Sequence, residues 1–146
     1  MSLVLLLLLS FARQPSQQPS SASSLETEIN KTGGALVYGI TFERDTASLQ
    51  TGSEKVLQQI VVLMREHSDW RFEVQGHTVA SDGAAAALAL STRRAVTVVD
   101  WLVAHGVHAD RLVAKGYGDT RPVATDRNDE SRLLNDRVQL RKLNEE

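Results

Sequence analysis

The chain lacks cysteine altogether and has little imbalance of charge. Without cysteine, disulfide bonds, thiolate metal sites and a lipid-modified N-terminal cysteine are excluded. The 16 lysine and arginine residues are nearly matched by 18 aspartate and glutamate residues, which gives a net charge of -2. No basic excess is present to neutralise phosphates, so we expect no nucleic-acid partner. The 146 residues, 42% of them hydrophobic, suffice for one ordinary core.

A hydrophobic run long enough to cross a bilayer is also missing. The apolar stretch from Leu3 to Leu9 falls far short of the roughly 20 residues that a membrane-spanning helix needs. Small residues two apart follow it, at Ser10 and Ala12, as is typical of a signal peptidase site. We therefore expect residues 1–12 to be a signal peptide, although no lysine or arginine precedes the apolar run. A short membrane-associating anchor and an artificial start are the alternatives.

Proline is scarce in the chain, and two of its three proline residues lie between Arg13 and Ser24. This segment is rich in serine and has no side chain that could drive burial, a composition that favours an extended, solvated chain. We predict a flexible linker and lead-in over residues 13–34 and one folded domain over residues 35–144.

The first elements of the domain follow from the spacing of apolar residues. Large apolar side chains occupy every second position from Leu36 to Phe42, which predicts a half-buried strand. Thr51 and Glu54 have the spacing of a capping box, and apolar residues follow at helical intervals. We predict a helix over residues 52–67.

The longest expected element is a helix that ends at His105, before the helix-stopping Gly106. Its start is open, because Ser91 is a suitable N-cap whereas the alanine run from Ala84 favours an earlier beginning. Residues 119–132 form a loop that carries one helical turn. Further strands are expected at Arg71–His77, Arg111–Tyr117 and Arg137–Leu143.

The order of these elements indicates the fold class. Helices of this length between strands fit right-handed crossovers. We therefore predict an α/β (α+β) two-layer sandwich, a β-α-β-α-β-β mixed sheet with its helices packed on one face.

Four separated motifs carry a family resemblance, namely Gly76-His77-Thr78, Leu90-Ser91-x-x-Arg94-Ala95, Lys115-Gly116-Tyr117-Gly118 and Asn135-x-Arg137-Val138. Together they closely resemble the OmpA-like domain over about residues 36–143. The resemblance implies a non-enzymatic domain that binds the diaminopimelate residue of peptidoglycan stem peptides and links an envelope component to the cell wall. It also implies a periplasmic location, at the outer membrane or wall of a Gram-negative-type bacterium, with outer-membrane or other envelope proteins as further partners.

The chemistry of that ligand explains the motifs. Diaminopimelate has an ammonium and a carboxylate on one carbon and therefore needs an anionic and a cationic partner close together. In the family, an aspartate after Gly-His-Thr takes the ammonium and the arginine of Leu-Ser-x-x-Arg takes the carboxylate. Arg94 matches that arginine, but Val79 stands at the aspartate position and Ala87 at that of a family asparagine.

Two acidic residues are candidates for the missing charge. Asp82 precedes Gly83, and a re-registered tight turn could bring it into the ammonium site; otherwise it starts a turn or caps the next helix. Asp136 stands where the family has an arginine, close to the expected site. If neither compensates, the alternative is a degenerate OmpA-like domain that serves as a structural or protein-interaction module of the envelope.

His77, Thr78, Asn135 and Arg137 complete the expected ligand pocket, although His77 at a strand end is also typical of a structural histidine. The other three histidines, which we interpret as surface residues, lack metal-site spacing, so we expect no metal and no cofactor. No nucleophile and base, and no paired carboxylates, have a spacing specific for catalysis. We therefore expect a binding protein and not an enzyme.

Overall fold

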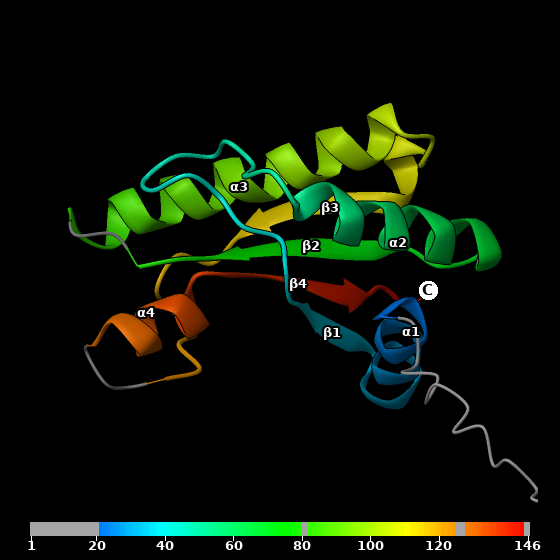
Figure 1. The fold of residues 1–146 in the computed structure, drawn as a ribbon, viewed down its shortest axis with the longest axis horizontal. Coiled ribbons are helices and arrows are strands. Elements are labelled where there is room, and N and C mark those ends of the chain that lie inside the picture. The colour runs from blue at the N-terminus through cyan, green and yellow to red at the C-terminus, as the bar shows by residue number, and fades with distance from the viewer. Residues whose placement is uncertain (1–20, 80–81, 125–127, 145–146) are drawn as a thin grey trace, which may run out of the picture.

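The computed structural model of the chain describes residues 21–79, 82–124 and 128–144 (Figure 1). The predicted signal peptide at residues 1–12 lies outside these ranges. Within them, no helix combines the length and apolar character that crossing a bilayer requires. The elements in chain order are α1 (Ser21–Thr32), β1 (Gly34–Val37), α2 (Ser53–Glu66), β2 (Phe72–His77), α3 (Ala84–Ala104), a 3-10 turn (Ala109–Arg111), β3 (Leu112–Gly116), α4 (Asp129–Asn135) and β4 (Arg137–Lys142).

The four strands form one mixed sheet in the order β1-β4-β2-β3. β2 and β3 are parallel and are joined through α3, whereas β4 runs antiparallel to both of its neighbours. α2 and α3 lie over the same face of the sheet (Figure 1). The predicted mixed sheet with helices on one face is thereby confirmed.

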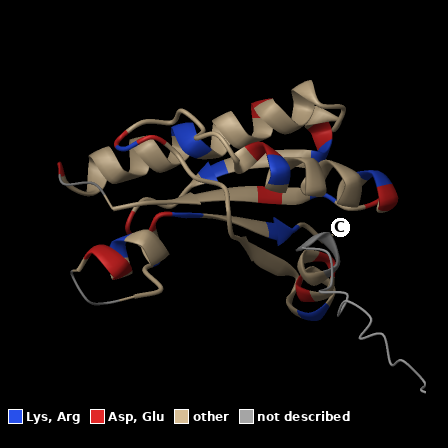
Figure 2. Ribbon diagram, viewed as in Figure 1, with Lys and Arg blue, Asp and Glu red and all other residues tan. Residues whose placement is uncertain are grey.

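The core lies between α2, α3 and the inward positions of the strands. Side chains alternate along each strand, so the paired residues Val74 and Leu140 face the helices whereas Glu73 and Gln139 face away. Figure 2 shows basic positions at both ends of β4 and a single acidic position on β2. The sheet face opposite the helices is therefore largely polar.

α3 begins at Ala84, so the earlier of the two predicted starts is correct. Its buried face includes Ala87, Ser91 and Arg94, whereas the large apolar Leu88 is 49% exposed. Hydrophobic periodicity could not find this face, because small and polar residues occupy its N-terminal half.

The first strand is shorter than predicted. β1 ends at Val37, and Tyr38, expected in the core, is 74% exposed. Gly39 has φ +93°, a left-handed conformation that turns the chain out of the sheet. Phe42 forms only an isolated bridge with Leu49.

The capping box predicted for the second helix does not form. Gly52 occupies the N-cap position in a left-handed conformation, and no side chain caps the helix. Instead, the buried Ser53 hydroxyl accepts a hydrogen bond from the Thr41 amide at 2.9 Å and donates one to the Thr41 carbonyl at 3.0 Å. Ser53 thereby fixes the segment that precedes the site.

The predicted linker and lead-in over residues 13–34 needs correction, because residues 21–32 form α1. Leu25 and Ile29 of this helix enter the core. His67, predicted to be a surface residue, has its Nε2 2.7 Å from Glu26 Oε1 and stacks on Trp70. The helix was missed because only these two apolar side chains anchor an otherwise polar sequence.

Glycine residues allow α3 to approach the sheet closely. A Cβ on Gly76 would overlap the backbone carbonyl of Ser91, and one on Gly116 would overlap the backbone and hydroxyl of Thr92. The Ser91 hydroxyl completes the contact by accepting a hydrogen bond from the Gly118 amide at 2.8 Å. The helix can lie this close to β2 and β3 only because these positions have no side chain.

We predict that Gly76→Ala lowers the free energy of unfolding by about 3 kcal/mol, because α3 must move away from the sheet. Gly33→Ala is the control, since its φ of +80° strains alanine but no atom lies within 4 Å of the added Cβ; we expect it to cost only about 1 kcal/mol. Urea unfolding measures both values. Equal losses would contradict the proposed close contact.

Candidate functional site

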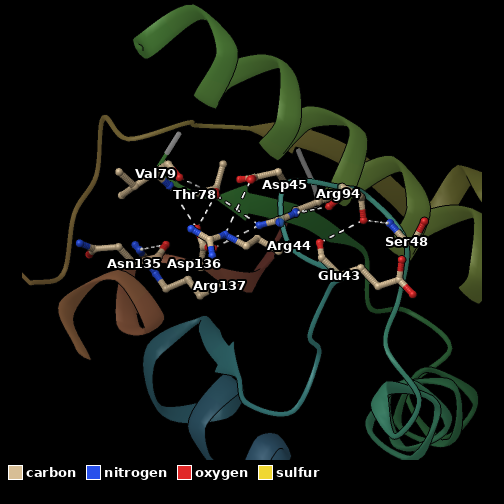
Figure 3. A network of polar contacts seen from close by, with 11 residues as sticks. Glu43, Arg44, Asp45, Ser48, Thr78, Val79, Arg94, Asn135, Asp136 and Arg137 are labelled. Atoms are coloured by element: carbon tan, nitrogen blue, oxygen red, sulfur yellow. Dashed lines mark hydrogen bonds and ion pairs between the residues drawn. The ribbon is translucent and has the colours of Figure 1, made fainter. Parts of the chain in front are cut away.

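Arg94 lies in the middle of α3 with its guanidinium group turned toward the sheet (Figure 3). Although charged, it is only 6% exposed. Its Nε donates a hydrogen bond to the Thr46 carbonyl at 2.8 Å, and its Nη1 donates one to the Thr78 hydroxyl at 3.2 Å. The guanidinium group is therefore held by Thr46 and Thr78, two residues far apart in the sequence. A buried cation requires such hydrogen-bond partners, because it has lost its contact with water.

The loop that supplies the Thr46 carbonyl is held by its own hydrogen bonds. The Glu43 amide donates to the Ser48 carbonyl at 2.8 Å, and the Thr46 amide donates to the Glu43 carbonyl at 3.1 Å. Asp45 has φ +57°, a left-handed conformation that aspartate tolerates at tight turns. The Phe42 ring lies 4.9 Å from the Arg94 guanidinium carbon, within cation–π range.

Asp136 provides the negative charge opposite Arg94 (Figure 3). It follows α4, a seven-residue helix that starts within the predicted loop of residues 119–132 and extends beyond it, and whose N-terminus is capped by the Asn128 side chain. Its Oδ1 accepts hydrogen bonds from the Thr78 hydroxyl and, at 3.1 Å, from the Val79 amide. Its Oδ2 lies 3.5 Å from Arg94 Nη1.

Arg94 and Asp136 face a cavity of about 580 Å³. Among the described residues, none forms a hydrogen bond with Arg94 Nη2 or with Asp136 Oδ2. Two N–H donors and one carboxylate oxygen are therefore available next to each other. The lining includes four guanidinium groups and three carboxylates, from Arg44, Arg94, Arg132, Arg137, Asp45, Asp129 and Asp136.

The structure brings most of the predicted site residues together, but not all of them. His77, Arg94 and Arg137 line the cavity. The Thr78 hydroxyl accepts a hydrogen bond from Arg94 and is not itself among the lining residues. Asp82 is exposed, is not among the described lining residues, and forms no hydrogen bond or ion pair with them. Its predicted entry into the ammonium site is absent from this conformation.

Asn135 and Arg137 fix the chain around the cavity. The Asn135 Oδ1 accepts hydrogen bonds from the amides of Val123 and Ala124, and its Nδ2 donates to the Ala124 carbonyl. Asn135 thus holds the loop at residues 123–124 in place and does not line the cavity. Arg137 donates from Nε to Gln139 Oε1 at 2.8 Å and from Nη2 to the Arg121 carbonyl at 2.8 Å.

A chain of hydrogen bonds sets the tautomer of His77. Tyr117 and Gln75 both donate to Glu73 Oε1. The Gln75 Oε1 therefore faces His77 and accepts a hydrogen bond from its Nε2 at 3.3 Å. Burial alone would raise the pKa of Glu73, but these two hydrogen bonds help to hold that pKa below its ordinary value. His77 Nδ1 is left as a buried acceptor without a partner among the described residues.

Burial, followed by the charges of Arg137 and Arg121, lowers the pKa of His77 to about 4. The imidazole is therefore neutral near pH 7, and the His77 ring stacks on Tyr117. The described residues contain no group of three or more side chains that could hold a metal ion.

Part of the site was not found from the sequence. Arg44, Asp45 and the Thr46 carbonyl lie in a polar loop without recognisable spacing. The nearest signal was the segment Ile40-Thr41-Phe42, which resembles the family and ends at the loop. A backbone carbonyl has no side-chain signature, so the Thr46 contact could be found only in three dimensions.

Comparison with protein families gives a match to the OmpA family over residues 41–136, which includes both Arg94 and Asp136. The chain belongs to the OmpA family. The predicted resemblance is thereby confirmed, and the matched range extends from Thr41, which lines the cavity, to Asp136, the acid that pairs with Arg94.

Individual OmpA relatives support this placement. The peptidoglycan-binding protein ArfA of Mycobacterium tuberculosis is 31% identical over 129 residues, which cover 86% of this chain and 38% of that protein. Outer membrane porin F of Pseudomonas aeruginosa is 34% identical over 101 residues, 68% of this chain and 29% of the porin. The crystal structure of the peptidoglycan-associated lipoprotein from Burkholderia pseudomallei superimposes with a TM-score of 0.69 at 25% identity, covering 89% of this chain and all of that one.

The lowered pKa of His77 predicts that stability depends on pH. Between pH 6.5 and about 4 the unfolded chain binds a proton at this imidazole and the folded protein does not. The free energy of unfolding should therefore fall as the pH falls through this window, by up to about 1.4 kcal/mol per pH unit from this group. Urea titrations at several pH values give the free energy of unfolding of the parent and of His77→Gln. Between pH 6.5 and about 4 this free energy should fall less steeply with falling pH in His77→Gln than in the parent. His108→Gln, which removes an exposed histidine, is the control, and a His77→Gln slope equal to the parent's would refute the assignment.

Proposed function

We propose that this OmpA domain binds peptidoglycan without catalysis, and that the cavity holds the end of a stem peptide. The observation that carries the proposal is the buried Arg94 in an ion pair with Asp136 beside one cavity, with Arg94 Nη2 and Asp136 Oδ2 both without a hydrogen bond to the described residues. The relative ArfA is a peptidoglycan-binding protein and matches 86% of this chain.

The finer assignment concerns diaminopimelate. Its side chain ends in a carbon with an ammonium and a carboxylate, and these two charges suit the two free groups of the cavity. Arg94 Nη2 donates to the carboxylate, and Asp136 Oδ2 accepts from the ammonium. Both contacts are charge-assisted hydrogen bonds, which are about twice as strong as neutral ones.

Asp136 compensates for the aspartate that Val79 replaces. A valine side chain has no charge to offer, but the Val79 amide still donates a hydrogen bond, and Asp136 Oδ1 accepts it at 3.1 Å. The carboxylate thus approaches the Gly-His-Thr segment from the opposite side, at the end of α4. Asp82, which is exposed, has no part in this binding mode.

The remaining predicted residues support the cavity. Thr78 donates to Asp136 and accepts from Arg94, so it sets the distance between the two charges. Arg137 and His77 form part of the wall, and Asn135 holds the loop at residues 123–124. In this arrangement their main contribution is to position the ligand-binding pair.

We further propose that binding takes place in the periplasm and links an envelope component to the wall. Relatives named as an outer membrane porin and a peptidoglycan-associated lipoprotein support an envelope location. The chain spans 38% of the length of ArfA, so what the rest of that protein does is not carried over.

The alternative is a degenerate domain that serves as a structural or protein-interaction module. Val79 and Ala87, at positions where the family has an aspartate and an asparagine, favour it. Ala87 lies on the buried face of α3, so its side chain contributes packing and no polar contact. Only a binding measurement separates the two functions.

We predict that Arg94→Ala and Asp136→Asn each weaken binding of a soluble muropeptide by about ten- to a hundredfold, because each removes one charge-assisted hydrogen bond. Isothermal titration calorimetry measures the affinity, and sedimentation with intact peptidoglycan sacculi gives the same comparison on the polymer.

Asp82→Ala is the matched control, because it removes an exposed carboxylate from the loop beside the site. We expect it to bind as the parent does. A loss with Asp82→Ala and none with Asp136→Asn would assign the ammonium to Asp82 instead. A parent protein that binds neither muropeptide nor sacculi would overturn the proposed function in favour of the degenerate module.

A further inference from the structure

The sheet face opposite the helices contains a second depression, of about 770 Å³. It lies between the C-terminal end of α1 and the chain at Arg121. Its floor is formed by outward-facing side chains of neighbouring strands, among them Gln75 and Gln139, which are directly paired. We call it the basic groove and define it by Leu36, Gln75, Arg121, Gln139, Arg141 and Lys142.

Among the described residues, the ionisable lining of the basic groove consists of Arg121, Arg141, Lys142 and Glu28. The Lys142 ammonium lies 4.6 Å from the centre of the Trp70 ring, on the helix-covered side, so Arg121 and Arg141 supply the positive charge of the groove. Neither Arg121 nor Arg141 forms an ion pair with any carboxylate of the described residues, but Arg141 is paired in register with Glu73, and its charge helps to lower the pKa of Glu73. Both side chains are exposed, and Figure 2 shows the basic end of β4 to which Arg141 belongs. Two exposed cations without a carboxylate in direct contact, on a polar floor, suit an anionic ligand.

Arg121 is held in place before any ligand arrives. Its guanidinium carbon lies 4.0 Å from the centre of the Tyr117 ring. The ring is itself fixed, since the Tyr117 hydroxyl donates a hydrogen bond to Glu73 at 2.5 Å. The Arg121 carbonyl accepts a hydrogen bond from Arg137. A preorganised cation loses less conformational freedom on binding than a free surface arginine does.

The basic groove and the ligand cavity are adjoining sites. Arg137 lines the cavity, and its guanidinium group bonds to Gln139 and to the Arg121 carbonyl, both of which belong to groove residues. A polymer whose stem peptide enters the cavity therefore passes close to the basic groove.

We propose that the basic groove binds the carboxylates of a neighbouring stem peptide on the same peptidoglycan polymer. This inference rests on the proposed function of the cavity. The occupant follows from two observations, namely the exposed positive charge of Arg121 and Arg141 and the continuity with the cavity through Arg137. A soluble muropeptide with one stem peptide fills the cavity alone, whereas intact sacculi present further stem peptides that reach both sites. The second contact acts at high effective concentration and so increases the affinity for the polymer.

The test compares two probes on the double variant Arg121→Ala/Arg141→Ala. We expect its affinity for sacculi to fall roughly three- to tenfold, as two exposed charge contacts would give. Its affinity for the soluble muropeptide should equal that of the parent. The loss on sacculi should shrink as salt is raised from 50 to 300 mM, since salt screens exposed charges. Unfolding midpoints establish that the variant is folded.

The double variant Lys55→Ala/Arg65→Ala is the matched control, because it removes two exposed cations from α2, on the helix-covered side. It should bind sacculi as the parent does. If the control loses as much, the effect is one of net charge and the groove proposal is wrong.

Failure of the basic groove is distinguishable from failure of the cavity. A parent that binds muropeptide, with a groove variant that retains full affinity for sacculi, overturns the basic groove alone. A groove variant that retains its affinity for sacculi but loses binding to a polyglutamate peptide would show that the basic groove binds an acidic protein segment. The proposal that the groove binds peptidoglycan would then be wrong. A parent that binds neither wall probe overturns both proposals.

Discussion

The close contact between α3 and the ends of β2 and β3 is the constraint on which the site depends. Gly76 and Gly116 leave no room for a side chain under Ser91 and Thr92, so the helix rests on strand backbone. Arg94 follows Ser91 by three residues, on the same buried face. Its guanidinium group therefore reaches Thr78, the residue directly after β2, without extending into solvent. A helix held farther away would leave this cation short of its partners.

Burial of that cation decides what surrounds it. A guanidinium group withdrawn from water requires acceptors and a counter-charge, and the fold provides them from the Thr46 carbonyl and from Asp136. Val79, where the family resemblance implies an aspartate, has no charge to offer, and its amide donates a hydrogen bond to Asp136. The counter-charge to Arg94 therefore comes from a residue far along the chain from the Gly-His-Thr segment.

Sequence patterns predicted the parts of the fold that depend on local periodicity. α2, β2, β3 and β4 lie where spacing indicated, and the motifs around Thr78 and Arg94 led to the cavity. Patterns failed where long-range contacts decide. α1 has too few apolar side chains to be recognised, β1 stops at a left-handed Gly39, and the buried face of α3 includes polar residues that the cavity requires. The loop carbonyl at Thr46 has no signature in any sequence.

The position of β4 shows that the folded domain is longer than the range of the family match. The family match ends at residue 136, one residue before β4 begins, yet β4 lies between β1 and β2 inside the sheet. The family match also starts after β1, at residue 41, and so leaves out the Val37 that β1 contributes to the core. A fragment cut to the matched range would keep every residue of the charged pair but lose the strand that joins the two halves of the sheet. Boundaries for a stable fragment should therefore follow the strand order and include residues 21–144.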